Sequence, residues 1–377
     1  MALDSAALEE HLRLAIVPGI GPSRVAALLA RFGTVARVLA ASTRELATVQ
    51  GIGPEFAARI AQAATPAGRA RAREALRTLA DMGAVALTPH DRLYPDAFRR
   101  LPDPPFVLYA AGRLEQLGLP AVGVVGTRAP TDYGRGAAHR LASDLARAGY
   151  AIVSGMARGI DAVAHAAALQ AGGPTIGVLG HGIDRVYPPD NRALFARVIK
   201  HGLLITELAP GEEPLAGNFP RRNRLIAALS AGVLVVEMGE KSGARHTVEF
   251  ALELGRDVFA VPGPIGSAAS AGTNQLLKEG ARLVTGARDI LEELHGVGNA
   301  PDPVEAMPPA PSAAPVAPPD LAPDEARVFA ALSPDARHVD EVAIAAGLGT
   351  SGTLTALLGL ELRDLAEALP GKQFRLR

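Results

Sequence analysis

Short apolar runs alternate with amphipathic stretches through the middle of the chain. The runs that are rich in β-branched residues lie at Ala121–Gly126, Ala151–Ser154, Thr175–Leu179, Leu203–Thr206, Val233–Glu237 and Val258–Val261. Each is followed by a longer segment with helical spacing. This alternation predicts parallel βαβ units and a doubly wound, mostly parallel α/β sheet of the Rossmann-like kind. Ligands of such sheets bind at the carboxyl ends of the strands, so the loops after the runs are candidate binding segments.

An internal repeat precedes this region. Val17-Pro18-Gly19-Ile20-Gly21-Pro22 returns as Val49-Gln50-Gly51-Ile52-Gly53-Pro54, and an Ala- and Arg-rich helical stretch follows each copy. Glycines permit a tight turn and proline suits the first helical position, so the repeat predicts two helix-hairpin-helix motifs in a small SAM-like helical domain. The starts of these helices could contact DNA phosphates, or the hairpins could only pack on each other.

The flanks of the alternating region have a different character. Between Gly83 and Gly112 we expect a connector with one strand, Ala84–Leu87, and irregular structure. Nine prolines between Gly296 and Pro323, without periodicity, predict an extended linker. After it, three helices and a terminal strand are expected and indicate a winged-helix module: Asp324–Leu332, Val339–Gly347, Thr353–Leu369 and 371–377. The predicted domains are therefore 1–80, 81–296, 297–323 and 324–377.

Composition narrows the choice of function. The 377 residues carry a formal net charge of −1, so any nucleic-acid site must be a local basic patch. The absence of cysteine excludes disulfides, thiol catalysis and Cys-ligated metals. No basic, then apolar, leader opens the chain, and no apolar run is long enough to span a bilayer. We expect a cytoplasmic protein that has no membrane partner.

The first two strand-end loops are suited to anions. Arg128 follows the first strand where a dinucleotide site would have Gly-x-Gly-x-x-Gly, so a nicotinamide cofactor is not expected; a phosphate clamp and a surface salt bridge remain open. The second loop offers a backbone cradle with an added cation, formed by Ser154, Gly155, Arg158 and Gly159. Asp161 is expected to cap the next helix. Together with His165 it lacks the further ligands that a metal site needs.

The later loops repeat this pattern. Three arginines and an asparagine at 221–224 open a helix. The helix dipole disfavours cations at that end, so their presence indicates a bound polyanion. The segment 241–247 forms a second phosphate cradle. Several such loops on one sheet edge fit a nucleic-acid strand better than a single nucleotide. The candidate phosphate-binding residues are Arg128, Ser154, Gly155, Arg158, Gly159, Arg221, Arg222, Asn223, Arg224, Lys241, Ser242, Gly243, Thr247 and Asn274.

Taken together, these motifs closely resemble the DNA-processing protein A (DprA/Smf) family. The matching segments are Gly126–Arg128, 154–161 with His165, Gly182 with Tyr187-Pro188, 219–230, 241–247 and 261–263. The resemblance implies a protein without established catalysis or cofactor that binds and protects single-stranded DNA, dimerises through its Rossmann-like domain and helps load RecA in natural transformation. By motif position it assigns the main phosphate contacts to Arg128, Arg221, Arg222, Arg224 and Lys241.

Two other functions stay open. Gly243, Thr247 and Glu249 partly match the loop of Rossmann-like nucleotide phosphoribohydrolases, although the preceding Pro-Gly-Gly is missing; nucleobase release from nucleoside monophosphates would reveal that enzyme. Alternatively, the chain is a protein-interaction scaffold whose basic loops hold a free nucleotide. Such a scaffold would saturate with a mononucleotide, whereas a strand binder gains affinity with oligonucleotide length.

Overall fold

The structure is a computed structural model that describes residues 3–295, 321–332, 337–369 and 371–376. The chain divides into two compact units, Met1–Ala306 and Met307–Arg377. The Pro-rich linker was predicted to span 297–323, and its residues 297–320 lie outside the described ranges. The domain boundaries drawn from the sequence stay predictions.

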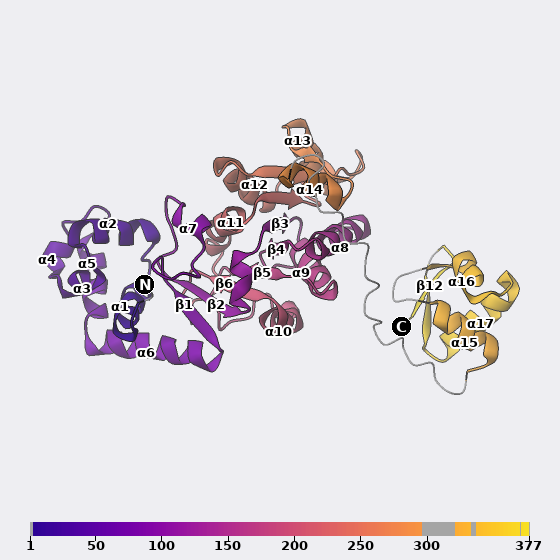
Figure 1. Ribbon diagram of the computed structural model, residues 1–377, viewed down its shortest axis with the longest axis horizontal. Helices are drawn as coiled ribbons and strands as arrows, with labels where there is room; N and C mark the ends of the chain where they lie inside the picture. The colour runs from indigo at the N-terminus through magenta and orange to yellow at the C-terminus, as the bar shows by residue number, and fades with distance from the viewer. Residues whose placement is uncertain (1–2, 296–320, 333–336, 370, 377) are drawn as a thin grey trace. The chain divides into compact units, whose positions relative to one another are not determined.

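The first unit is built around a nine-stranded sheet with the order β1-β2-β6-β5-β4-β3-β7-β8-β9 (Figure 1). Its strands are β1 (Ala84–Leu87), β2 (Leu108–Gly112), β3 (Ala121–Val125), β4 (Ala151–Ser154), β5 (Thr175–Val178), β6 (Leu203–Thr206), β7 (Gly232–Val235), β8 (Asp257–Ala260) and β9 (Arg282–Leu283). All neighbours from β6 to β9 in this order are parallel. The predicted doubly wound sheet is confirmed.

The strand expected at Ala84–Leu87 is confirmed, but the expectation of irregular structure as far as Gly112 is wrong for its last five residues. Strand β2 pairs antiparallel with both β1 and β6, and the short helix α7 (Asp96–Arg99) precedes it. The sequence of β2, Leu-Tyr-Ala-Ala-Gly, contains no β-branched residue and therefore has a weak strand signal. Two hydrogen-bonding neighbours and the burial of Tyr109 impose the strand in spite of that weak local preference.

Helices cover both faces of the sheet because residues of the central strands alternate between them. In β3, Val122 and Val124 pack with α8 (Asp132–Arg147), α9 (Ile160–Gln170) and α14 (Ala287–His295). Ala121 and Val125 point to the opposite face. That face is covered by α11 (Asn218–Leu229), α12 (Ala244–Glu253) and α13 (Ala271–Lys278), while α10 (Arg192–His201) packs beside β2 and β6.

The N-terminal part of this unit is helical. Its helices are α1 (Ser5–Ala15), α2 (Pro22–Phe32), α3 (Val35–Ala40), α4 (Thr43–Leu46), α5 (Pro54–Ala63) and α6 (Pro66–Asp81). Proline opens both α2 and α5, and Gly19 and Gly51 take positive φ angles of 78° and 80° in the preceding turns. Because such angles strain other residues, the repeated glycines are what allow the two hairpins predicted from the sequence.

The second unit is a small winged-helix module. It contains α15 (Pro323–Ala331), β10 (Arg337–His338), α16 (Val339–Ala346), α17 (Thr350–Leu362), β11 (Ala366–Leu369) and β12 (Gln373–Leu376), with sheet order β10-β12-β11. The helix expected to continue to Leu369 ends at Leu362 instead. Asp364 turns the chain with a φ of 58°, and β11 then pairs antiparallel with β12.

Within the described ranges, no single helix has the length and apolar character needed to cross a membrane. The bent pair of α16 and α17 meets that test only when the two helices are taken together, by length and composition.

Candidate nucleic-acid interface

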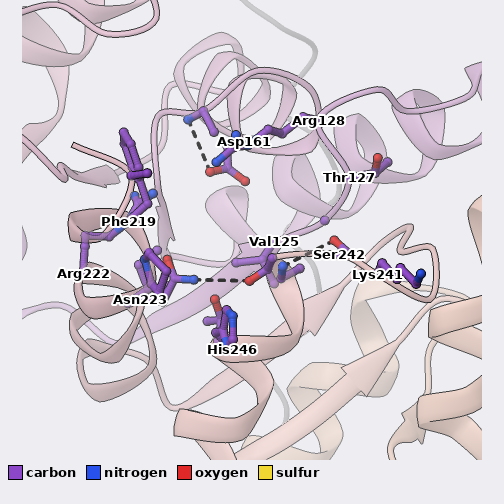
Figure 2. A pocket seen from close by; sticks show the side chains of 18 of the residues that line it. Val125, Thr127, Arg128, Asp161, Phe219, Arg222, Asn223, Lys241, Ser242 and His246 are labelled. Atoms are coloured by element: carbon purple, nitrogen blue, oxygen red, sulfur yellow. Dashed lines mark hydrogen bonds between the residues drawn. The ribbon is translucent and has the colours of Figure 1, made fainter. Parts of the chain in front are cut away.

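A pocket of about 680 Å³ opens where the strand order of the sheet reverses, between β3 and β7. It is lined by the segment after β3, the start of α11 and the loop that leads from β7 into α12. Doubly wound sheets bind their ligands at this topological switch point, at the carboxyl ends of the strands. The candidate residues that line it are Arg128, Arg222, Asn223, Lys241, Ser242, Gly243 and Thr247 (Figure 2).

Arg128 stands at the mouth of this pocket without a charged partner. Its guanidinium lies 5.9 Å from the centre of the Phe219 ring, and it is exposed. No hydrogen bond or ion pair joins it to another residue in the part of the chain that the structure describes. The loop that carries it is held by Glu237, whose carboxylate accepts hydrogen bonds from the backbone N–H of Thr131 at 2.8 Å and from its hydroxyl at 2.7 Å.

The loop before α12 supplies a second cation beside the start of a helix. Lys241 is exposed and, among the described residues, has no ion-pair partner. Gly243, also exposed, is the N-cap of α12, and the first turn of the helix carries no acidic residue. The Ser242 hydroxyl accepts the backbone N–H of Ala244 at 3.3 Å. Asn223 reaches across from α11 and donates to the Gly243 carbonyl at 3.4 Å. The combination of a helix start without an acidic residue with Lys241 and Arg128 is suited to a phosphate.

A buried polar cluster forms the floor of the pocket. Arg222 is only 5% exposed and donates from Nη1 to the Val178 carbonyl at 2.5 Å. Burial lowers the pKa of this guanidinium to about 10, so it stays charged at neutral pH. Burial raises the pKa of Asp161, an effect that the charge of Arg222 opposes, and burial and Arg222 together lower the pKa of His165 to about 3. The floor therefore presents the charged guanidinium of Arg222, and the buried imidazole of His165 is neutral at that pH.

The cradle at 154–159 is already filled by the protein itself. The Asp161 carboxylate accepts the backbone N–H of Gly155 at 3.0 Å and of Ala157 at 3.3 Å, rather than capping α9 as expected from the sequence. The Ser154 hydroxyl donates to the Val124 carbonyl at 2.6 Å. Gly159, with a φ of 77°, packs against the backbone of the Arg128 loop. We therefore leave Ser154, Gly155 and Gly159 out of the direct contact set.

Two arginines at the start of α11 form ion pairs with a buried carboxylate. Glu207 pairs with Arg224 at 2.6 Å and with Arg221 at 3.6 Å, and Arg224 also lies 3.3 Å from Asp103. Arg224 is buried and does not line the pocket. These contacts assign Arg224 to the packing of α11, whereas Arg221 is partly exposed and lies beside Gly21 of the first hairpin.

Three other polar side chains that the sequence drew attention to have internal partners. Arg158 pairs with Asp190 at 2.6 Å, and Arg245 pairs with Glu279 at 3.0 Å. Asn274 bonds both to the N–H and to the carbonyl of Gly263, and it lines a separate cavity. Among the described residues, the exposed positive charge that lies near the pocket without an ion-pair partner is therefore that of Arg128 and Lys241.

An aromatic pair borders the pocket, and sequence reasoning did not find it. The rings of Tyr187 and Phe219 lie 5.6 Å apart at an interplanar angle of 32°, and both line the pocket. Tyr187 is 41% exposed, so part of this residue is accessible to a ligand. The two residues are 32 positions apart in a chain with few aromatics, so no local pattern marks them as neighbours.

Three family models match the chain. The one described as DNA recombination-mediator protein A covers residues 85–295, a DprA winged helix domain covers 311–372, and a SAM-like helix-hairpin-helix tandem covers 12–65. They correspond to the sheet unit, the C-terminal module and the repeated hairpins. These features define a Rossmann-like protein that carries an N-terminal helix-hairpin-helix tandem and a C-terminal winged-helix domain.

Known relatives agree with these models. A putative DNA processing protein DprA from Mycobacterium tuberculosis is 41% identical and covers 81% of each chain, and Protein Smf from Synechocystis is 36% identical over 77% of this chain and 80% of its own length. The crystal structure of Streptococcus pneumoniae DprA superposes with a TM-score of 0.66 at 34% identity, covering 78% of this chain and 99% of that one. The chain belongs to the DprA/Smf family.

Proposed function

We propose that this protein binds single-stranded DNA in the switch-point pocket. The observation that carries the proposal is the pair of unpaired cations, Arg128 and Lys241, beside the open aromatic ledge of Tyr187 and Phe219. Phosphates would lie on the cations and on the N-terminus of α12, while a base stacks on the ledge. Cationic grooves with stacking surfaces are the usual means of holding single strands without sequence preference.

The electrostatics favour a local site. The overall charge is near neutral, and Arg158, Arg224 and Arg245 are offset by carboxylates. Arg128 and Lys241 retain their charge, so a polyanion is attracted to the pocket rather than to the surface as a whole. A solved structure of a relative supports this proposal, because it concerns the single-stranded DNA binding mode of DNA processing protein A from Helicobacter pylori. That chain is 33% identical, with a TM-score of 0.51, over 56% of this chain and 95% of its own.

The ledge gives a reason for preferring a single strand. In a duplex both faces of each base are stacked and its pairing edge is occupied, so a base can reach Tyr187 only after it is unstacked and unpaired. That step costs a few kcal/mol for a duplex and little for a single strand. The proposed selectivity comes from this difference and not from reading the base edges.

The wider role that we propose is that of a recombination mediator. It protects incoming single strands, loads RecA onto them in natural transformation or repair, acts as a homodimer through the Rossmann-like sheet, and works in the cytoplasm without catalysis. The description of the matching family as a recombination-mediator protein supports this role. RecA filament formation on strands coated by a single-strand-binding protein, with and without this chain, measures it.

Fluorescence anisotropy tests the binding step. Labelled single-stranded and duplex oligonucleotides of several lengths are titrated across a salt series. The proposal expects affinity for single strands that grows with length and falls with salt. Equal, weak binding of both forms at low salt would refute it.

The two alternative functions, a nucleotide phosphoribohydrolase and a nucleotide-binding scaffold, can be tested with the same protein samples. Glu249 pairs with His246 and does not line the pocket, so the phosphoribohydrolase resemblance provides no carboxylate there from the 241–249 segment. Release of a nucleobase from nucleoside monophosphates would favour that enzyme. Full competition by a mononucleotide, without any gain from oligonucleotide length, would favour the nucleotide-binding scaffold.

A further inference from the structure

The third helix of the winged-helix module, α17, has a surface that is unsuited to DNA. In helix-turn-helix folds the corresponding helix enters the major groove, and its affinity depends on cations that meet phosphates. No Lys or Arg lies between Thr350 and Leu362, and the only charged residue of the helix is Glu361. The described part of the module carries seven acidic and five basic side chains. Its electrostatics therefore oppose a polyanion.

The same helix exposes an apolar stripe. Leu354, Leu358 and Leu362 follow one another at intervals of four residues and are 44%, 57% and 81% exposed. Residues four apart lie on one face of a helix, so the three leucines form a continuous strip. Ser351 and Glu361 are exposed on the same face, at opposite ends of α17. Leucines this exposed on one face indicate a surface that another molecule covers.

The ends of α17 are complementary to each other. Its N-terminus follows Gly349, has no side-chain cap, and has no acidic residue in the first turn, which leaves the positive end of the helix dipole uncompensated. At the other end, Glu361 forms no ion pair or side-chain hydrogen bond with any other residue in the described ranges. Two copies of α17 that run antiparallel would place each free carboxylate beside the uncapped start of the other helix.

We propose that α17 pairs antiparallel with α17 of a second copy of this chain. A two-fold axis between Leu354 and Leu358 sets Leu354 of each copy against Leu358 of the other, and Ser351 against Glu361. The stretch from Thr350 to Leu360 is uncharged, so the approach of two identical faces brings no like charges together along the stripe. A contact of this kind is isologous and closes on itself as a dimer.

This contact is small. One helix of 13 residues is about 20 Å long, and three leucines on each side bury far less than the roughly 1,600 Å² of a standard interface. The pairing is therefore weak between free chains and gains strength when the chains are already joined or concentrated, for example along one DNA strand. The inference does not rest on the pocket, since no pocket residue takes part in it.

Cysteine crosslinking tests the pairing and its direction, because the full chain contains no cysteine. Ser351→Cys and Glu361→Cys are made in separate chains, one of them with a size tag, and are oxidised mildly alone and mixed. In the antiparallel pair, positions 351 and 361 of different copies are adjacent, whereas 351 lies about 15 Å from its own equivalent, beyond disulfide reach. The mixture should give a covalent dimer with both sizes of chain, and each variant alone should stay monomeric on a denaturing gel.

Controls keep the result interpretable. Adding Leu358→Glu to both chains should abolish the crosslink, and adding Leu119→Glu, an exposed leucine of the first unit, should leave it unchanged. Crosslinking that is as strong in the single-variant samples as in the mixture, or no crosslink in the mixture, overturns the proposal. If the Ser351→Cys/Glu361→Cys mixture gave no crosslink while Leu358→Glu lost duplex binding, the stripe would be assigned to DNA instead.

Discussion

Removing Arg128 and Lys241 together should change the salt dependence of DNA binding in a way that the structure specifies. Neither side chain has a charged partner among the described residues, so each is free to neutralise one phosphate. Each phosphate contact with a single strand contributes about −0.7 to the slope of log K against log salt. The Arg128→Ala/Lys241→Ala variant should therefore have a slope that is shallower by about 1.4.

This difference in slope is easily measured. Raising the salt concentration from 50 to 200 mM weakens DNA binding by both proteins. Because the variant lacks two phosphate contacts, its affinity should fall about sevenfold less than that of the unaltered chain. Anisotropy with a labelled single strand at five or six salt concentrations gives both slopes. At low salt the variant should also bind more weakly, and to the same degree for strands of different sequence.

A matched variant removes the same number of charges. In Arg158→Ala/Arg245→Ala both lost guanidiniums are ones that already pair with carboxylates, Asp190 and Glu279. Its slope should change by less than half as much. If this control flattened the slope as strongly as the Arg128/Lys241 pair, or if that pair left the slope unchanged, the assignment of the pocket would be wrong.

Three further results are expected. Arg224→Met should leave the salt slope unchanged but lower the free energy of unfolding in urea by about 3 kcal/mol, because it leaves a buried carboxylate without its closest partner. Gly155→Ala should weaken strand binding at every salt concentration in the anisotropy assay, since its Cβ would fall 2.1 Å from Nη1 of Arg222 and displace that guanidinium. The pKa of His165 is lowered to about 3 in the fold, so the unfolded chain takes up its proton first as the pH falls below about 6.5. Stability should fall through that window by at most about 1.4 kcal/mol per pH unit from this group, and urea titrations at pH 5 and pH 7 should show a smaller difference for His165→Gln.

The sequence predicts the sheet well because local strand preference and tertiary packing favour the same structure there. The strands from β3 to β8 are buried runs rich in β-branched residues, and their periodicity needs no knowledge of the neighbours. Strand β2 was missed because Leu108–Gly112 has no such signal and is extended only through its pairing with β1 and β6. The end of α17 was placed too late for a similar reason, since Ala366–Leu369 is helix-compatible by composition and becomes a strand through β12.

The sequence indicates which loops line the candidate site, but not which carboxylates pair with the cations of those loops. Motif position indicates several of the segments that line the pocket, since strand ends of a doubly wound sheet meet at one edge. What no local pattern gives is which cations are neutralised. Arg224 pairs with Glu207, 17 positions before it, and Arg158 pairs with Asp190, 32 positions after it. The aromatic ledge depends in the same way on a contact between distant segments.

The most direct test of the account places a fluorophore in the pocket. The chain has no tryptophan, so the emission of a Tyr187→Trp variant reports on the ledge alone. Titration with an unlabelled single-stranded oligonucleotide should quench or shift that emission to saturation, duplex of equal length should do so weakly, and the response should be lost when Arg128→Ala and Lys241→Ala are added. Unchanged emission in a sample whose anisotropy shows that the strand is bound would place the DNA elsewhere and contradict the account.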